Sequence, residues 1–174
     1  MKNGILFLAF GMFFLASCGN ESSSNAAETE TTTEIESMVS TEADNTDASG
    51  NSVTLELTGD DQMRYNKKEL KVKAGQKVTL NFKHIGKMKL EVMGHNFVLL
   101  VPGTDITAFG TEAAKAKENG YIPEGTDAVI VHTDMIGGGE STSITFDAPE
   151  KGVYDYICSF PAHFALMQGK FIVE

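Results

Sequence analysis

Cysteine is scarce in this 174-residue chain, which contains Cys18 and Cys158 and no others. If the N-terminal cysteine is modified, as argued below, Cys158 has no partner for a disulfide. An unpaired thiol is unusual in an exported protein, because an oxidising compartment favours disulfide formation. Cys158 therefore needs a chemical reason to persist, and metal ligation is one.

Positive charge is also in short supply. Lys and Arg number 14 against 24 Asp and Glu, so the formal net charge is −10 at pH 7. Nucleic-acid binding needs a basic face, and this class of function is excluded. The domain from Val53 onward keeps 16 acidic and 13 basic residues and is only mildly acidic, because most of the excess acid lies before it.

Residues 1–18 are predicted to be a bacterial lipoprotein signal peptide. Lys2 supplies a positive start, and the apolar run at 4–16 is too short to span a bilayer as a helix. The run ends in Leu-Ala-Ser-Cys, which resembles a lipobox, where the cysteine is lipidated and becomes the mature N-terminus. We expect export to the periplasmic or cell-surface side, with a lipid anchor at Cys18. The alternative is an ordinary signal peptide cut nearby.

Residues 19–52 are predicted to be an acidic, disordered tether. They contain eight acidic residues, no Lys or Arg, and few apolar side chains beyond Ile35, Met38 and Val39. Such a segment cannot bury enough surface to offset the entropy of ordering. The expected organisation is thus a signal peptide (1–18), a tether (19–52) and one folded domain (53–174).

The domain is predicted to consist of short strands with alternating apolar residues, separated by Gly, Pro and Asp. The expected strands are 53–59, 69–84 with a turn at Ala74-Gly75, 95–101, 128–133, 141–148, 152–158 and 169–174. About seven such strands predict an all-β sandwich. Residues 111–120 are the exception, because their Ala, Lys and Glu content and closing Gly predict a short inserted surface helix.

Three potential metal ligands lie within ten residues, in the sequence CSFPAHFALM at 158–167. Cys158 offers a thiolate, His163 an imidazole and Met167 a thioether. Soft sulfur ligands suit Cu(I), and two histidines with one thiolate and a weak axial thioether define the blue-copper arrangement. The second histidine must come from elsewhere in the chain. The candidates are His84, His95 and His132.

His95 lies in the motif VMGHN (92–96), and at this point the chain resembles the azurins, which are small cupredoxins. The similarity covers 53–174 and rests also on HTDMIGGGES (132–141), SITFD (143–147) and CSFPAHFALMQG (158–169). The spacing Cys-x4-His-x3-Met is moderately specific alone and strong together with the upstream motif. The resemblance implies a cupredoxin Greek-key β-sandwich that holds one copper ion cycling between Cu(II) and Cu(I).

Carried over residue by residue, the resemblance makes His95, Cys158 and His163 the equatorial copper ligands. It makes Met167 the long axial ligand and places the backbone carbonyl of Gly94 on the opposite axial side. Glycine suits this last position, because the backbone must approach the metal without a Cβ in the way.

The resemblance also implies supporting roles. Asn96 is expected to tie the two ligand loops together, and backbone amides at Asn96 and near Phe160 are expected to donate hydrogen bonds to the thiolate, which tune the potential. His84 matches a family histidine near the site that does not bind copper. For His84 and His132 an ordinary structural role is favoured.

Three features depart from the family pattern. Phe97 stands where many azurins have a tryptophan, and Ala162 stands where they have a glycine. The disulfide common in azurins is missing, since neither partner cysteine is present. None of these departures touches a ligand.

The expected function is single-electron transfer by a type 1 copper site, and not enzymatic catalysis. The alternative is copper storage or delivery, which favours open methionine clusters. The five methionines of the domain are scattered: Met63, Met88, Met93, Met135 and Met167. A cysteine hydrolase needs a base-orienting group and an oxyanion hole, and the sequence has no local sign of either.

The resemblance implies redox partners such as c-type cytochromes or copper and haem reductases, and a monomer is expected. His163 lies on the loop joining the last two strands, so its ring edge is expected at the surface, where the electron would pass. The expected surrounding rim is apolar: Met63, Met93, Phe160, Pro161, Ala162 and Leu166. For Met63, Met93 and Phe160 the alternative, an ordinary core position, stays open.

Overall fold

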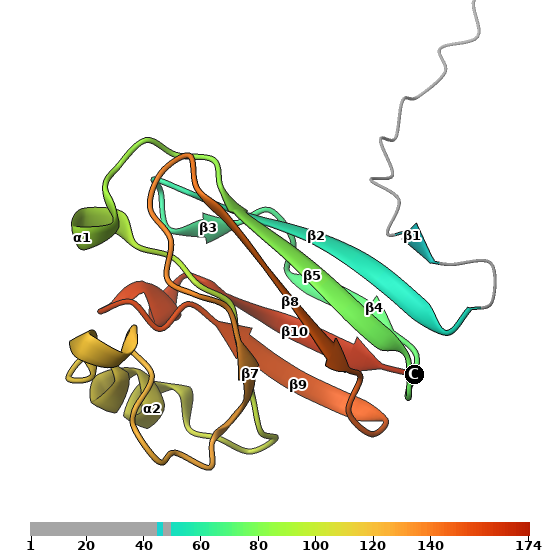
Figure 1. Ribbon diagram of the computed structural model, residues 1–174. Helices are drawn as coiled ribbons and strands as arrows, with labels where there is room; N and C mark the ends of the chain where they lie inside the picture. Colours follow the sequence, from blue (N-terminus) through green and yellow to red (C-terminus); the bar gives the residue numbers. More distant parts are fainter. Residues whose placement is uncertain (1–44, 47–49) are drawn as a thin grey trace, which may run out of the picture. The chain divides into compact units, whose positions relative to one another are not determined.

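The computed structural model describes residues 45–46 and 50–174 (Figure 1). The predicted signal peptide, with Cys18, lies outside the described residues, as does the predicted tether apart from 45–46 and 50–52. Within the described part of the chain, no helix is both long and apolar enough to cross a membrane.

Two five-stranded sheets form the domain (Figure 1). The first has the order β1-β2-β5-β8, with β3 paired to β2, and its strands are β1 (Asn45–Thr46), β2 (Ser52–Asp60), β3 (Arg64–Tyr65), β5 (Lys77–His84) and β8 (Ser141–Asp147). The second has the order β4-β10-β9-β6-β7, from β4 (Glu69–Val72), β10 (Gln168–Val173), β9 (Gly152–Ile157), β6 (Val98–Leu100) and β7 (Val129–His132). The pairs β2–β5 and β4–β10 are parallel, and the other pairs are antiparallel.

The alternation of apolar residues explains which face of each strand is buried. Val53, Leu55 and Leu57 of β2 are buried, whereas the residues between them are more exposed, as the two-residue period of a strand requires. Strand β5 follows the same rule. The two sheets share one core, which includes Leu70, Val78, Leu80, Phe82, Phe97, Leu99, Tyr156 and Phe171. The predicted all-β sandwich is confirmed.

The inserted helix begins earlier than the sequence pattern predicted. Helix α2 is Ile106–Ala113 instead of 111–120, and a short 3-10 helix, η1, follows at Lys117–Asn119. Asp105 determines the start, because its side chain accepts hydrogen bonds at 2.9 and 3.0 Å from two backbone N–H groups of the first turn. Such an N-cap stabilises a helix start, and the Ala-rich composition that guided the prediction lies beyond it.

Gly110 in the middle of α2 also makes the helix hard to predict from the sequence, because glycine is a poor helix former. A Cβ at Gly110 would come within 2.3 Å of Cδ1 of Phe164, so the packing requires a glycine. Phe164 belongs to the second 3-10 helix, η2 (His163–Ala165). It packs against a second small core of Val98, Leu100, Phe109, Ala113, Ile122 and Ile157. Helix α2 therefore supports the segment that carries His163.

Candidate metal centre

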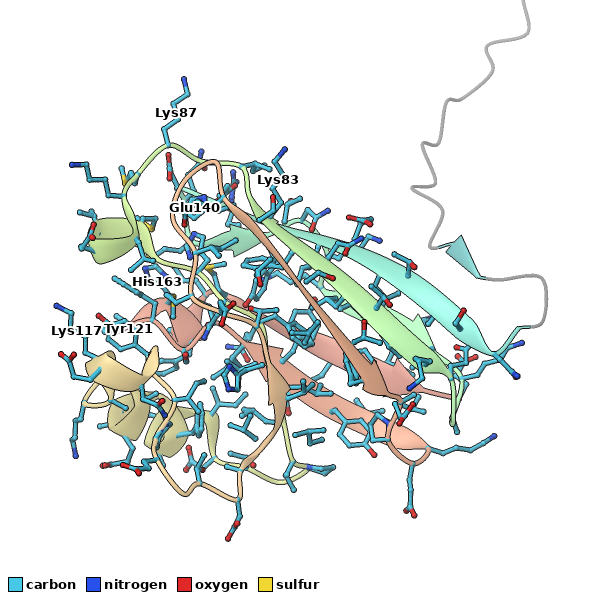
Figure 2. All side chains as sticks on the ribbon, in the orientation of Figure 1. Lys83, Lys87, Lys117, Tyr121, Glu140 and His163 are labelled. Atoms are coloured by element: carbon cyan, nitrogen blue, oxygen red, sulfur yellow. The ribbon has the colours of Figure 1, made fainter. Side chains whose placement is uncertain are left out.

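Three buried side chains from two distant loops of the chain converge at one end of the sandwich, where Figure 2 labels His163. His95 follows the single-turn helix α1 (Leu90–Met93), Cys158 follows β9, and His163 begins η2. Cys158 Sγ lies 3.9 Å from His95 Nδ1 and 3.7 Å from His163 Nδ1. The two Nδ1 atoms are 3.2 Å apart. Ligand atoms this close can share one metal ion, given metal–ligand bonds of about 2.0–2.3 Å.

The far side of the His95 ring determines which nitrogen faces the site. His95 Nε2 lies 2.8 Å from the backbone carbonyl oxygen of Asp60. A carbonyl can only accept, so Nε2 carries the ring proton and donates it. Nδ1 then keeps a free lone pair directed toward Cys158 and His163, which is the orientation that a metal-binding imidazole needs.

Burial disfavours charge on each of the three groups. It raises the pKa of the Cys158 thiol to about 12, while the backbone N–H groups of Asn96 and Phe160 act in the opposite direction. Burial, and then the nearby histidines, lower the pKa of His163 to about 4. The pKa of His95 is also lowered, mainly by burial. Both imidazoles are therefore neutral at pH 7, and a bound cation would compensate a thiolate here.

Met167 is fully buried beside these groups. A Cβ on Gly59 of β2 would lie 2.9 Å from His95 Cδ2 and 3.3 Å from Met167 Cε. The His95 ring and the end of the Met167 side chain therefore both lie next to Gly59. The Cys158 N–H donates to the Met167 carbonyl at 3.0 Å, and the Met167 N–H donates to the His163 carbonyl at 2.8 Å. Backbone hydrogen bonds thus hold this loop closed around the site.

Gly94 presents its carbonyl oxygen 3.8 Å from Cys158 Sγ. A Cβ at this position would come within 2.8 Å of the Leu90 carbonyl oxygen and 2.9 Å of Phe160 Cδ2. Its φ of −64° is ordinary, so close approach, and not an unusual backbone conformation, requires the glycine. All the predicted ligand residues lie together at this end of the sandwich: Gly94, His95, Cys158, His163 and Met167.

Asn96 ties the two ligand loops together, as expected. Its side-chain Oδ1 accepts a hydrogen bond from the Ser159 N–H at 2.9 Å, and its Nδ2 donates to Ser159 Oγ at 2.8 Å. Both residues are fully buried. These bonds join the residue after His95 to the residue after Cys158, so they hold the histidine and the thiol at a set separation.

His84 lies beside the site, stacked on His95 with ring centroids 4.3 Å apart and an interplanar angle of 19°. Its Nε2 lies 2.8 Å from the Met93 carbonyl oxygen, and its Nδ1 accepts the Gly86 N–H at 3.0 Å. Both ring nitrogens are engaged by backbone, so His84 supports the ligand ring and is not placed to bind metal. His132 is exposed on β7 and lies outside the cluster.

The surface over the site differs from the expected rim. Phe160 is buried at 8% exposure, and its ring packs on His163 and Tyr121 with centroid distances of 4.6 and 5.1 Å. It covers the imidazole instead of lining the rim. The expectation that the ring edge of His163 lies at the surface is therefore wrong, since the residue is only 3% exposed. The other expected members are partly or fully exposed: Met63, Met93, Pro161, Ala162 and Leu166. Val92 of α1, at 62% exposure, is a further exposed apolar residue that the sequence did not single out.

Sequence reasoning missed two contributors to the site. Asp60 acts through its backbone carbonyl, which every residue has, and Gly59 acts through the absence of a side chain. Neither leaves a motif, because the residue type does not reveal that its backbone faces His95.

Comparisons with known proteins agree with this geometry. A family model described as copper binding proteins, plastocyanin/azurin family, matches residues 51–174. Azurin-1 from Alcaligenes xylosoxydans xylosoxydans is 42% identical over 120 residues, which cover 67% of this chain and 93% of that protein. The solved structure of auracyanin A, a "blue" copper protein from Chloroflexus aurantiacus, has a TM-score of 0.65 at 33% identity and covers 71% of this chain and 99% of its own. An azurin from Methylomonas sp. strain J has a TM-score of 0.63 at 35% identity, with 70% and 97% covered.

A buried site of two histidines and one cysteine at the end of a β-sandwich defines a blue-copper protein. The chain belongs to the plastocyanin/azurin family of copper-binding proteins. Its cofactor is copper, and it is a single-electron carrier.

Proposed function

We propose that His95, Cys158 and His163 are the three strong copper ligands, and that the Met167 thioether and the Gly94 carbonyl are two weaker ones. The observation that carries this proposal is the convergence of two imidazoles and one buried thiol whose ligand atoms lie within 4.8 Å of one another. Copper bound there supplies one-electron exchange between Cu(II) and Cu(I).

The protein's own contribution is rigidity and the exclusion of water. Asn96 and Ser159 hold the two ligand loops together, and the Asp60 carbonyl holds the His95 ring. His95 and Cys158 are fully buried. A preorganised, dry site has little to rearrange when its charge changes, which favours rapid electron exchange.

An electron carrier is favoured over an enzyme by the state of Cys158. A nucleophilic cysteine reacts as the thiolate and has a lowered pKa and some exposure. Burial instead raises the pKa of the Cys158 thiol to about 12, and the side chain is fully buried. A substrate would have no access to the sulfur, so we propose no catalytic role.

We also propose that a redox partner docks on the apolar surface beside His163 and that His163 is the exit for the electron. His163 is the one strong ligand with any exposure. The surface comprises Met63, Met93, Pro161, Ala162 and Leu166. Apolar surface is readily desolvated, and weak redox encounters bury less than about 1,200 Å². Partners such as c-type cytochromes or copper and haem reductases fit this mode, and a monomer suffices.

The last part of the proposal concerns location. A signal peptide at 1–18 would export the protein, and a lipid on Cys18 would anchor it to a bacterial membrane on the periplasmic or cell-surface side. The support is the sequence Leu-Ala-Ser-Cys after a short apolar run. The tether would allow the domain to move, with a root-mean-square span of roughly 30–35 Å if it is a flexible coil.

Copper titration tests the ligand set. Cu(II) bound by the Cys158 thiolate is expected to absorb strongly in the red, because charge transfer from sulfur needs a short covalent bond. The colour is expected to bleach on reduction and return on oxidation without loss of copper. Cys158→Ser is expected to abolish the colour, and His132→Ala, outside the cluster, to keep it. A blue Cys158→Ser protein would refute the ligand set, and release of copper at each cycle would favour storage or delivery.

A further inference from the structure

The hairpin of β2 and β3 holds the His95 segment at two points. The two strands pair antiparallel. At the end of β2, the Asp60 carbonyl lies 2.8 Å from His95 Nε2. On β3, the Tyr65 hydroxyl donates to the backbone carbonyl of Asn96 at 2.5 Å, in a buried contact. One hairpin therefore makes hydrogen bonds to both a proposed ligand, His95, and the residue that follows it, Asn96.

The bond from Tyr65 completes the set of partners around Asn96. The Asn96 side chain is bonded to Ser159 through both its oxygen and its nitrogen. Its backbone N–H acts on the Cys158 thiol and lowers the pKa of that group, against the larger effect of burial. Without Tyr65, the Asn96 carbonyl would lose this buried partner, and an unpaired buried carbonyl costs free energy. The hydroxyl is therefore a structural constraint on the segment that faces the thiol.

Tyr65 is well suited to act as a fixed anchor. Its side chain is 4% exposed, and its ring packs against Phe82 and Tyr156 with centroid distances of 6.0 and 5.4 Å. Burial raises the pKa of Tyr65 well above its usual range, so the hydroxyl stays protonated and remains a donor at neutral pH. A phenol held in this way keeps its hydroxyl directed at one acceptor.

We propose that Tyr65 is a positioning residue for the copper site, whose hydroxyl holds the Asn96 backbone so that the Asn96 N–H stays directed at the Cys158 sulfur. This inference rests on the proposed ligand set. An N–H donor stabilises the additional negative charge on the sulfur when copper is Cu(I), and hydrogen bonds around the cysteine sulfur tune the potential of such sites. Loosening Asn96 therefore lowers the reduction potential.

Two tyrosine variants of the full chain test this role. Tyr156 is the matched control, because its side chain is also buried. Its hydroxyl also donates to a backbone carbonyl, that of Lys67 at 2.7 Å, which lies outside the ligand loops. Tyr65→Phe is expected to lower the reduction potential and shift the red absorption band. At a fixed solution potential, the ratio of Cu(I) to Cu(II) is expected to fall by less than about tenfold. This limit follows because the net free energy of one neutral hydrogen bond rarely exceeds the equivalent of about a tenfold change in an equilibrium constant. Tyr156→Phe is expected to change neither.

A second readout needs no copper. In the copper-free protein, hydrogen exchange at the Asn96 amide is expected to be faster in Tyr65→Phe and unchanged in Tyr156→Phe. If Tyr65→Phe fails to fold, NMR of the unaltered copper-free protein tests the proposal instead. The proposal requires that the Tyr65 hydroxyl proton exchanges slowly and lies close to the Asn96 segment. Rapid exchange of that proton would overturn it.

The outcomes separate this inference from the ligand set. If the two variants lose equal thermal stability while potential, band and Asn96 exchange stay unchanged in Tyr65→Phe, then Tyr65 is only a core residue. If the unaltered protein shows no red band with Cu(II), the ligand set itself fails. An unaltered protein with the band, beside a Tyr65→Phe protein with none of the expected changes, removes only the role of Tyr65.

Discussion

At the scale of single residues, Cys158 shows how burial keeps a thiol unreactive in the absence of copper. The thiolate, not the thiol, is the form that oxidises and that binds metal. Burial raises the pKa of Cys158 to about 12, so the copper-free protein keeps the thiol form. Backbone N–H groups of Asn96 and Phe160 act in the opposite direction and lower the pKa of the thiol in part. An unpaired cysteine could therefore persist even if the protein is exported, as the sequence predicts.

Met167 carries the first prediction at this scale. Met167→Leu is expected to keep the blue colour, because the thiolate and both imidazoles remain. The reduction potential is expected to rise, since losing an axial donor disfavours Cu(II) more than Cu(I). We expect a rise on the order of 60 mV, which corresponds to about a tenfold change in the redox ratio for one electron. Voltammetry measures it, and a lower potential would contradict the axial assignment.

At the scale of elements, the site is assembled from segments that end or begin there. Helix α1 leads into Gly94 and His95, β9 ends before Cys158, and η2 begins at His163. The sheets supply fixed ends, and the loops supply the ligands, which is the usual division of labour in a β-sandwich. Strand β2 also contributes, because it approaches the ligands closely at Gly59.

Gly59 gives a prediction for this strand. A Cβ at Gly59 would come 2.9 Å from His95 Cδ2 and 3.3 Å from Met167 Cε, so Gly59→Ala overpacks the site. Destabilisation of the copper-free protein by roughly 1–3 kcal/mol is expected, with a shifted copper spectrum. Gly152→Ala, whose Cβ would lie 3.3 Å from Tyr154 and away from the ligands, is the control. Denaturant unfolding and absorption spectra compare the two, and equal spectra would show that β2 does not constrain the ligands.

At the scale of the whole molecule, the proposed docking surface and the predicted lipid anchor belong to separate parts of the chain. The proposed docking surface is the one beside His163, which Figure 2 labels at the ligand end of the domain. The predicted anchor, Cys18, precedes a predicted tether of 34 residues at 19–52. A tether of that length would let the docking surface reach a partner while the lipid stays in the membrane.

Met93→Lys tests the docking surface. Met93 is half-buried on α1, and a lysine there adds a charge that must be desolvated when a partner docks. Electron transfer to the natural partner is expected to slow by about tenfold, equivalent to roughly 1.4 kcal/mol, with the blue spectrum nearly intact. Val153→Lys adds the same charge at an exposed apolar position near the start of β9. Equal rates for both variants in stopped-flow measurements would move the docking face elsewhere.

Cys18→Ser tests the anchor. The unaltered protein is expected in the membrane fraction with a lipid on Cys18, because acylation requires the cysteine thiol. The Cys18→Ser protein is expected to lose the lipid and appear in the soluble fraction, with copper binding unchanged. Fractionation and mass spectrometry of the N-terminus measure both. A Cys18→Ser protein that is still acylated and membrane-bound would exclude this mode of attachment.

Much of the fold could be predicted from local sequence pattern, and the errors arose where particular contacts in the folded chain decide the structure. Strand alternation in β2 and β5 predicted the sandwich, because a half-buried strand must alternate. The inserted helix was misplaced, because its start depends on the Asp105 cap and its central Gly110 is explained only by Phe164. For Phe160 the sequence left rim and core open, and the residue is buried, because only the folded chain brings Tyr121 over it.

The sequence by itself determined the fold class, because strand periodicity is a local property. The spacing from Cys158 to Met167 indicated three of the proposed ligands, and the resemblance to the azurins added His95 and Gly94. The tertiary structure alone decided which His95 nitrogen faces the site, how little of His163 reaches solvent, and that Tyr65 holds Asn96. These depend on contacts between distant residues, such as the 31 positions that separate Tyr65 from Asn96. A backbone carbonyl or a packed ring has no signature in sequence, so its role appears only when folding brings its partner beside it.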